Sequence, residues 1–135
     1  MTQGPSPRSL TFTGRIRSFS FAIHGIAIML RSQHNAWIHA AATVSVVTVG
    51  VFFGISRTDW CWIVLAIVAV WTAEAVNTAL EFLTDVASPG FHPIAGQAKD
   101  VAAGAVLIAA TGSVIIGVLV LGPHILRWLG WIRAY

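Results

Sequence analysis

Residues 72–85 read TAEAVNTALEFLTD, and this stretch decides how the rest of the chain is interpreted. Four polar side chains recur in it at intervals that suit a helix: Glu74, Asn77, Glu81 and Asp85. At about 100° per residue they share one stripe about 80° wide, and most of the remaining helix surface is apolar. A carboxylate that faces lipid is costly, so the stripe is expected to face a protein interior or water.

The chain around this stretch has the composition of a membrane protein. Of its 135 residues, 56% are apolar and 10% are charged, and the mean hydropathy is +0.78. An average globular chain is about 25% charged. Three apolar stretches, at about 36–55, 60–83 and 101–122, each approach the ~20 residues that cross a bilayer. Tryptophans lie at the predicted membrane edges, as in an aromatic belt: Trp60, Trp62, Trp128 and Trp131.

The N-terminal part is expected to lie outside these spans. Residues 1–14 are polar and contain two prolines, which predicts a disordered tail before a domain at 15–135. Residues 15–31 carry apolar side chains at helical spacing, which predicts an amphipathic helix, either in the membrane interface or packed on the protein. The predicted fold is therefore all-α, with one surface helix and three transmembrane helices.

Charge gives the expected orientation and excludes one class of function. Four arginines precede the first span, so the N-terminus and the loop 86–100 should face the cytoplasm. The expected location is the plasma (inner) membrane. Arg127 and Arg133, near the C-terminus, argue weakly for the opposite orientation. The net charge is only +3 and the arginines are scattered, whereas a nucleic-acid binder would show a dense basic patch.

The depth of the stripe indicates a chemistry. If the second span enters the hydrocarbon at Trp60, Glu74 lies ~7 Å inside the cytoplasmic boundary, with Glu81 and Asp85 at or beyond it. Glu74 is then within reach of a lipid hydroxyl, while water and Mg²⁺ are available to the other two carboxylates. Phosphoryl transfer from ATP to a lipid alcohol needs this division. Polar residues can instead hold membrane helices together, but three acids on one face exceed that need.

A second polar element, Lys99-Asp100, closes the loop before the third span. Lys99 is the only lysine, and an ammonium at a helix N-terminus suits a phosphate group. A lysine that merely marks the membrane edge is the alternative. His34 and His39 enter the first span beside Gln33, where hydrogen bonding is a simpler role for them than metal binding. The sequence contains no Walker loop and no glycine-rich kinase loop.

Two motifs at a fixed separation carry a resemblance to a known family. They are Glu74-x-x-Asn77-Thr78-Ala79-x-Glu81-x-x-x-Asp85 and Ala98-Lys99-Asp100-Val101-Ala102-Ala103-Gly104-Ala105-Val106. Upstream lie Ser18-Phe19-x-x-Ala22-x-x-Gly25 and Asn35-x-x-Ile38-His39. Together these elements resemble the bacterial diacylglycerol kinase and undecaprenol kinase family, over roughly residues 15–122.

The resemblance implies a particular assembly, substrates and site residues. It implies a homotrimer in the lipid bilayer with active sites shared between subunits, ATP with Mg²⁺ as donor, and diacylglycerol or undecaprenol as acceptor. It makes Glu74 the catalytic base and Glu81 a metal ligand. The remaining matches are Lys99 and Asp100 as nucleotide contacts, Asn77 and Asp85 as supporting polar residues, and Arg15, Gly90, Phe91 and His92 on the nucleotide side.

One position departs from the family pattern. Gln33 stands where the family usually has a second metal-binding glutamate, so the expected metal site carries one negative charge fewer. Two alternatives follow: a non-catalytic membrane protein of this fold with a weakened metal site, or a small ion-conducting subunit that uses the carboxylate stripe. The Ala-Ser-Pro-Gly loop at 87–90 leans toward the undecaprenol branch of the family.

Overall fold

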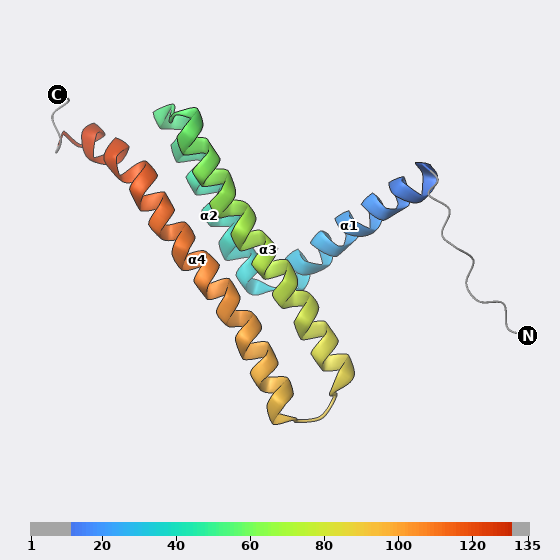
Figure 1. The fold of residues 1–135 in the computed structure, drawn as a ribbon. Helices are drawn as coiled ribbons and strands as arrows, with labels where there is room; N and C mark the ends of the chain where they lie inside the picture. The colour runs from blue at the N-terminus through green and yellow to red at the C-terminus, as the bar shows by residue number, and fades with distance from the viewer. Residues whose placement is uncertain (1–11, 131–135) are drawn as a thin grey trace, which may run out of the picture.

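The computed structural model describes residues 12–130, with side chains from residue 15 onward. Over this range the chain forms four α-helices: α1 (Phe12–Ser32), α2 (His34–Phe53), α3 (Arg57–Ala87) and α4 (Pro93–Trp128) (Figure 1). The expected all-α fold is confirmed. The helices α2, α3 and α4 are each long and apolar enough to cross a membrane. Residues 1–11 of the tail predicted at 1–14 lie outside the described residues.

Short polar connections set the helix ends. The helix α2 stops at Gly54, whose φ of 59° is the left-handed conformation that favours glycine. Two residues later α3 starts with a capping box, in which the Ser56 hydroxyl accepts the Asp59 N–H at 3.2 Å and the Asp59 carboxylate accepts the Ser56 N–H at 3.2 Å. The sequence therefore allows only a tight turn between α2 and α3.

The helices α3 and α4 run antiparallel and pack along their length, with α2 against α3 (Figure 1). The apolar core lies near the α2–α3 turn and is built on Ile55, Ile63 and Leu121. Trp60 packs closely over α2, because a Cβ added to Gly50 would lie 3.0 Å from its ring. A larger residue at position 50 would therefore have to displace the side chains of Trp60 and Ile55.

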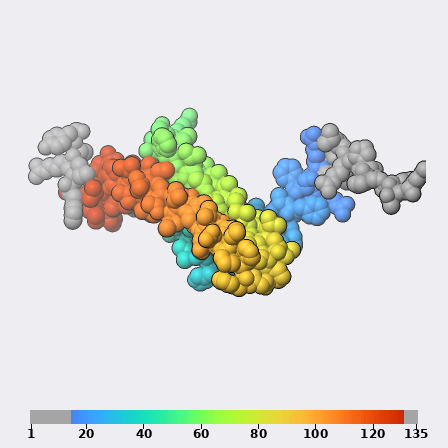
Figure 2. Space-filling model, turned by 60° about the horizontal axis from the view of Figure 1, so that its bottom comes forward, coloured from blue at the N-terminus to red at the C-terminus, as the bar shows by residue number. Residues whose placement is uncertain are grey.

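The outer faces of the bundle are strongly apolar. Large exposed side chains cover them, among others Val64, Leu65, Val68, Leu107, Ile108, Val114, Val118 and Leu119. Each such side chain would cost about 1.5–3 kcal/mol if left in water rather than buried. These faces therefore need lipid or another chain against them, as expected for spans. By contrast the N-terminal part of α1 extends away from the bundle, as both Figure 1 and Figure 2 show, while its C-terminal end packs there with Met29 buried.

The helix boundaries differ from those expected. The helix α1 begins at Phe12, inside the stretch predicted as tail, and α4 extends beyond the predicted 101–122 in both directions. The loop expected at 86–100 shrinks to the few residues between Ala87 and Pro93. Counting apolar residues finds only the part of a helix inside the hydrocarbon, whereas the hydrogen-bonded helix continues into polar sequence.

The length of α3 makes the topology testable. Its 31 residues extend over ~46 Å, more than the ~30 Å hydrocarbon core, so its two ends should lie on opposite sides of the membrane. In a Cys61→Ala background, cysteines at Thr58 and Ser88 should react with an impermeant thiol reagent from opposite sides of sealed vesicles. Labelling of both from the same side would contradict a transmembrane α3.

Candidate active site

The polar stripe of α3 runs from the interior of the bundle to its surface. Glu74, Asn77 and Thr78 are 1%, 5% and 4% exposed and are the buried polar residues of the described chain. Glu81, one to two turns further, is half-buried, and Asp85 is exposed. The stripe thus faces the protein interior at its buried end, as its angular spacing predicts, and reaches the solvent-accessible end of α3.

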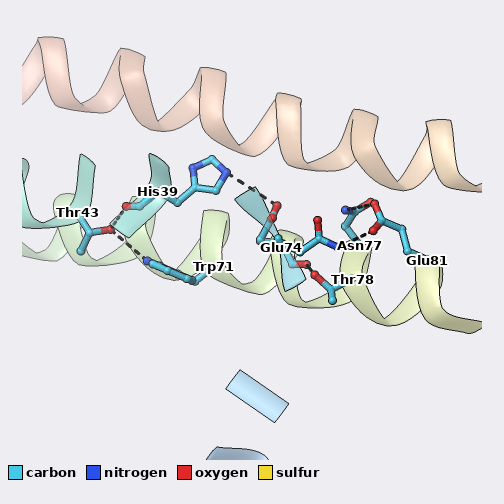
Figure 3. Close-up of polar contacts among 8 residues, drawn as sticks. His39, Thr43, Trp71, Glu74, Asn77, Thr78 and Glu81 are labelled. Carbon is cyan, nitrogen blue, oxygen red and sulfur yellow. Dashed lines mark hydrogen bonds and ion pairs between the residues drawn. The ribbon is translucent and has the colours of Figure 1, made fainter. Parts of the chain in front are cut away.

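Glu74 has an unusual environment for a buried acid. Both carboxylate oxygens are buried, and neither accepts a hydrogen bond from any described residue. The imidazole Nε2 of His39, on α2, lies 3.9 Å from Glu74 Oε2, beyond hydrogen-bonding distance (Figure 3). A buried polar group without a hydrogen bond costs several kcal/mol at most sites, which makes such a group a candidate for function rather than stability.

Glu81 is held by two amides. Gln33 Nε2, at the junction of α1 and α2, donates to Glu81 Oε2 at 2.6 Å, and Asn77 Nδ2 donates to Glu81 Oε1 at 2.9 Å. The structure therefore brings Gln33 and Glu81 together across 48 positions of sequence. The amide oxygen of Asn77 is buried and has no hydrogen-bond partner among the described residues.

The side chains of this cluster carry oxygen atoms, although both amides turn their nitrogens and not their oxygens toward Glu81. Mg²⁺ prefers oxygen ligands, and the carboxylate of Glu81 lies beside the side-chain amides of Gln33 and Asn77, each of which carries one such oxygen. Within residues 15–130 no three His, Cys, Asp or Glu side chains form a group that could hold a metal ion. A cation bound here would therefore depend on negative charge from a second bound molecule, such as the phosphates of a nucleotide.

Lys99 lies at the solvent end of the stripe. Its ammonium forms an ion pair with the carboxylate of Asp85, so this contact links α4 to α3. Both side chains are exposed enough for water to screen them, at 38% and 64%. Such pairs contribute about 0–1 kcal/mol, so an incoming anion can take Lys99 from Asp85 at little cost. Asp100 follows on α4 and is exposed.

The remaining predicted positions are not brought into this cluster. Gly90 and Phe91 are exposed in the α3–α4 loop, and Phe91 is 97% exposed. His92 caps α4, where its Nδ1 accepts the Ile94 N–H at 3.3 Å. Arg15 is exposed on α1, which extends away from the bundle (Figure 1). A single chain therefore presents the carboxylates and Lys99 but leaves Arg15 apart from them.

Sequence reasoning missed a link between α2 and α3 beside Glu74. Trp71 Nε1 donates to the Thr43 hydroxyl at 3.1 Å, and that hydroxyl donates to the carbonyl oxygen of His39 at 2.8 Å (Figure 3). Trp71 precedes Glu74 by one turn, and Thr43 follows His39 by one turn. A tryptophan in the middle of a span, rather than at its edge, was the available signal.

The fold defines a small integral-membrane protein in which a polar stripe runs from the buried middle of α3 to its exposed end. The chain belongs to the prokaryotic diacylglycerol kinase family, whose family model matches residues 20–121. It is therefore a lipid kinase, an enzyme that transfers a phosphoryl group. The family resemblance seen in the sequence motifs is confirmed.

Three relatives illustrate the similarity. The undecaprenol kinase of Bacillus subtilis (strain 168) is 38% identical over 109 residues, which cover 81% of this chain and 89% of the relative. A diacylglycerol kinase of Synechocystis sp. is 36% identical over 110 residues, which cover 81% of this chain and 63% of the relative. The diacylglycerol kinase of Escherichia coli (strain K12) is 26% identical over 109 residues, covering 81% and 77%.

The Trp71–Thr43 hydrogen bond should stabilise the pairing of α2 with α3. Hydrogen bonds between membrane helices contribute about 0.6 kcal/mol on average, so Trp71→Phe and Thr43→Val should each lower the unfolding free energy in detergent. The double variant should lose less than the sum of the two single variants, because both remove the same bond. Strictly additive losses in denaturant titrations would contradict this link.

Proposed function

We propose that the enzyme transfers the γ-phosphoryl group of ATP to the hydroxyl of a membrane lipid alcohol, with Glu74 as the catalytic base. The observation that supports this most is the gradient along α3, from the buried, unbonded Glu74 carboxylate to the half-buried Glu81 and the exposed Asp85. A lipid hydroxyl and a charged nucleotide need these two environments side by side.

The proposed reaction is a direct displacement. A carboxylate oxygen of Glu74 takes the proton of the lipid hydroxyl while the hydroxyl oxygen of the lipid attacks the γ-phosphorus of ATP. The bond from the γ-phosphorus to the β–γ bridging oxygen breaks, and ADP leaves. An apolar cavity of about 520 Å³ between α2, α3 and α4 has His39, Val70 and Leu121 in its walls and suits the hydrocarbon tail.

The nucleotide side is assigned to the other polar groups. Glu81, with amide oxygens of Gln33 and Asn77, would hold Mg²⁺, which when bound offsets charge on the phosphates. Lys99 would exchange Asp85 for a phosphate oxygen, and Asp100 lies next to it. The α3–α4 loop, with Gly90, Phe91 and His92, and Arg15 of α1 complete the proposed nucleotide contacts.

Assembly and orientation belong to the same proposal. A homotrimer with shared sites would cover the exposed apolar faces of the bundle and would allow α1 and Arg15 to reach a neighbouring subunit. The four arginines before the first span favour an N-terminus in the cytoplasm, with α1 at the interface of the plasma (inner) membrane. This orientation also puts Lys99 and Glu81 on the side where ATP is found.

Undecaprenol is the acceptor that we favour over diacylglycerol. The Ala-Ser-Pro-Gly loop at 87–90 resembles that of the undecaprenol kinases more closely. The Bacillus subtilis relative, which is 38% identical, is named an undecaprenol kinase. Incubation of the purified protein with labelled ATP, Mg²⁺ and both lipid alcohols, followed by thin-layer separation, should show label mainly in undecaprenyl phosphate. Ion flux without lipid labelling would contradict the kinase proposal and favour an ion-conducting subunit.

Replacement of the base should stop the chemistry and leave nucleotide binding intact. Glu74→Gln should lower the rate of lipid phosphorylation by about 10²-fold, because the amide cannot take a proton. The matched control is Asp59→Asn, another acid-to-amide change on α3, at the opposite end from the proposed site. Near-normal turnover in Glu74→Gln, or an equal loss in the control, would contradict the assignment.

Position 33 tests the proposed Mg²⁺ site. Gln33→Glu would place a second carboxylate at the Gln33–Glu81 contact of 2.6 Å, where the two charges repel unless a cation lies between them. The half-saturating Mg²⁺ concentration at fixed ATP should fall about tenfold, which corresponds to ~1.4 kcal/mol. The saturated rate should change less, because proton transfer depends on Glu74. Superimposable Mg²⁺ titrations of the two proteins would remove position 33 from the site.

A further inference from the structure

His39 stands between the apolar cavity and the buried carboxylate of Glu74. Its imidazole is 16% exposed, lines the cavity, and points its Nε2 toward Glu74 Oε2 at 3.9 Å (Figure 3). Among residues 15–130, no ion-pair contact other than this one involves Glu74. The imidazole of His39, a hydrogen-bond donor, therefore faces one oxygen of the proposed base.

The pairing of α2 with α3 fixes this arrangement. The Thr43 hydroxyl accepts from the Trp71 indole at 3.1 Å and donates to the His39 carbonyl at 2.8 Å. The same hydroxyl therefore joins the backbone turn that carries His39 to the turn of α3 before Glu74. This link holds the backbone turn that carries His39 against α3, so the imidazole starts from a position that faces Glu74.

We propose that His39 is a positioning residue for Glu74, an inference that rests on the proposed kinase reaction. In the tautomer with its proton on Nε2, the imidazole donates to one carboxylate oxygen and leaves the other directed at the lipid hydroxyl. The separation of 3.9 Å needs to close by about 1 Å to become a hydrogen bond. In enzymes without bound substrate, catalytic hydrogen bonds often have longer distances, which shorten when substrate binds.

This arrangement follows the general logic of an oriented base. A carboxylate that is buried and unbonded can rotate about its last side-chain bond, and only some orientations place an oxygen lone pair on the acceptor hydroxyl. A third group that fixes the base increases the fraction of productive orientations. Loss of His39 should therefore lower kcat, whereas a residue that only lines the lipid cavity would affect the KM for lipid.

The decisive comparison is between His39→Gln and His39→Met. Glutamine and methionine have similar length and shape, but only the glutamine amide can donate a hydrogen bond to Glu74. Methionine also suits the apolar wall of the cavity, so folding should tolerate it. A third variant, His124→Met, removes another half-buried imidazole, at the far end of α4, and serves as the matched control.

The expected kinetics are specific. His39→Met should lower kcat about tenfold with both KM values within about twofold of the unsubstituted protein, while His39→Gln and the control should keep most of the activity. Equal kcat for the glutamine and methionine variants, or a change confined to the KM for lipid, would overturn the positioning role alone. Absence of lipid phosphate from the unsubstituted protein would overturn the proposed function together with it.

Discussion

The fold is organised by the cost of placing a carboxylate in hydrocarbon. Glu74 lies within a span, so α3 can sit in a membrane only if other helices cover that face of it. The helices α2 and α4 provide the cover, and Glu74 becomes the least exposed acid of the described chain, at 1%. The remaining faces of the same helices carry apolar side chains outward, which is the opposite of the pattern in a soluble bundle.

The sequence allowed much of this to be predicted. Runs of apolar residues near ~20 in length give the spans, and the spacing of Glu74, Asn77 and Glu81 gives the buried face, because both depend only on local helix geometry. The contacts across helices were not available from such patterns. The Gln33–Glu81 bond and the His39–Glu74 approach depend on how α2 is set against α3, which the Thr43–Trp71 hydrogen bond helps to fix.

The nucleotide side was harder to predict for a different reason. Its proposed members come from the stripe, from the α3–α4 loop and from α1, and α1 does not fold back on its own bundle. The sequence therefore identifies Arg15 as a candidate, but within one chain Arg15 lies apart from the other proposed site residues. The buried half of the stripe depends on packing inside one chain, while the exposed half depends on charge pairs such as Lys99–Asp85, which water screens.

The continuity of α3 has one more consequence. Glu74 and Asp85 sit on one unbroken helix, so the distance between the buried and the exposed carboxylate is set by the rise of the helix, ~16 Å, and not by loop conformation. Addition or loss of a single residue between them would turn the downstream polar groups by about 100°, out of line with Glu74. An insertion or deletion should therefore be tolerated in the turns at either end of α3 and not between Glu74 and Asp85.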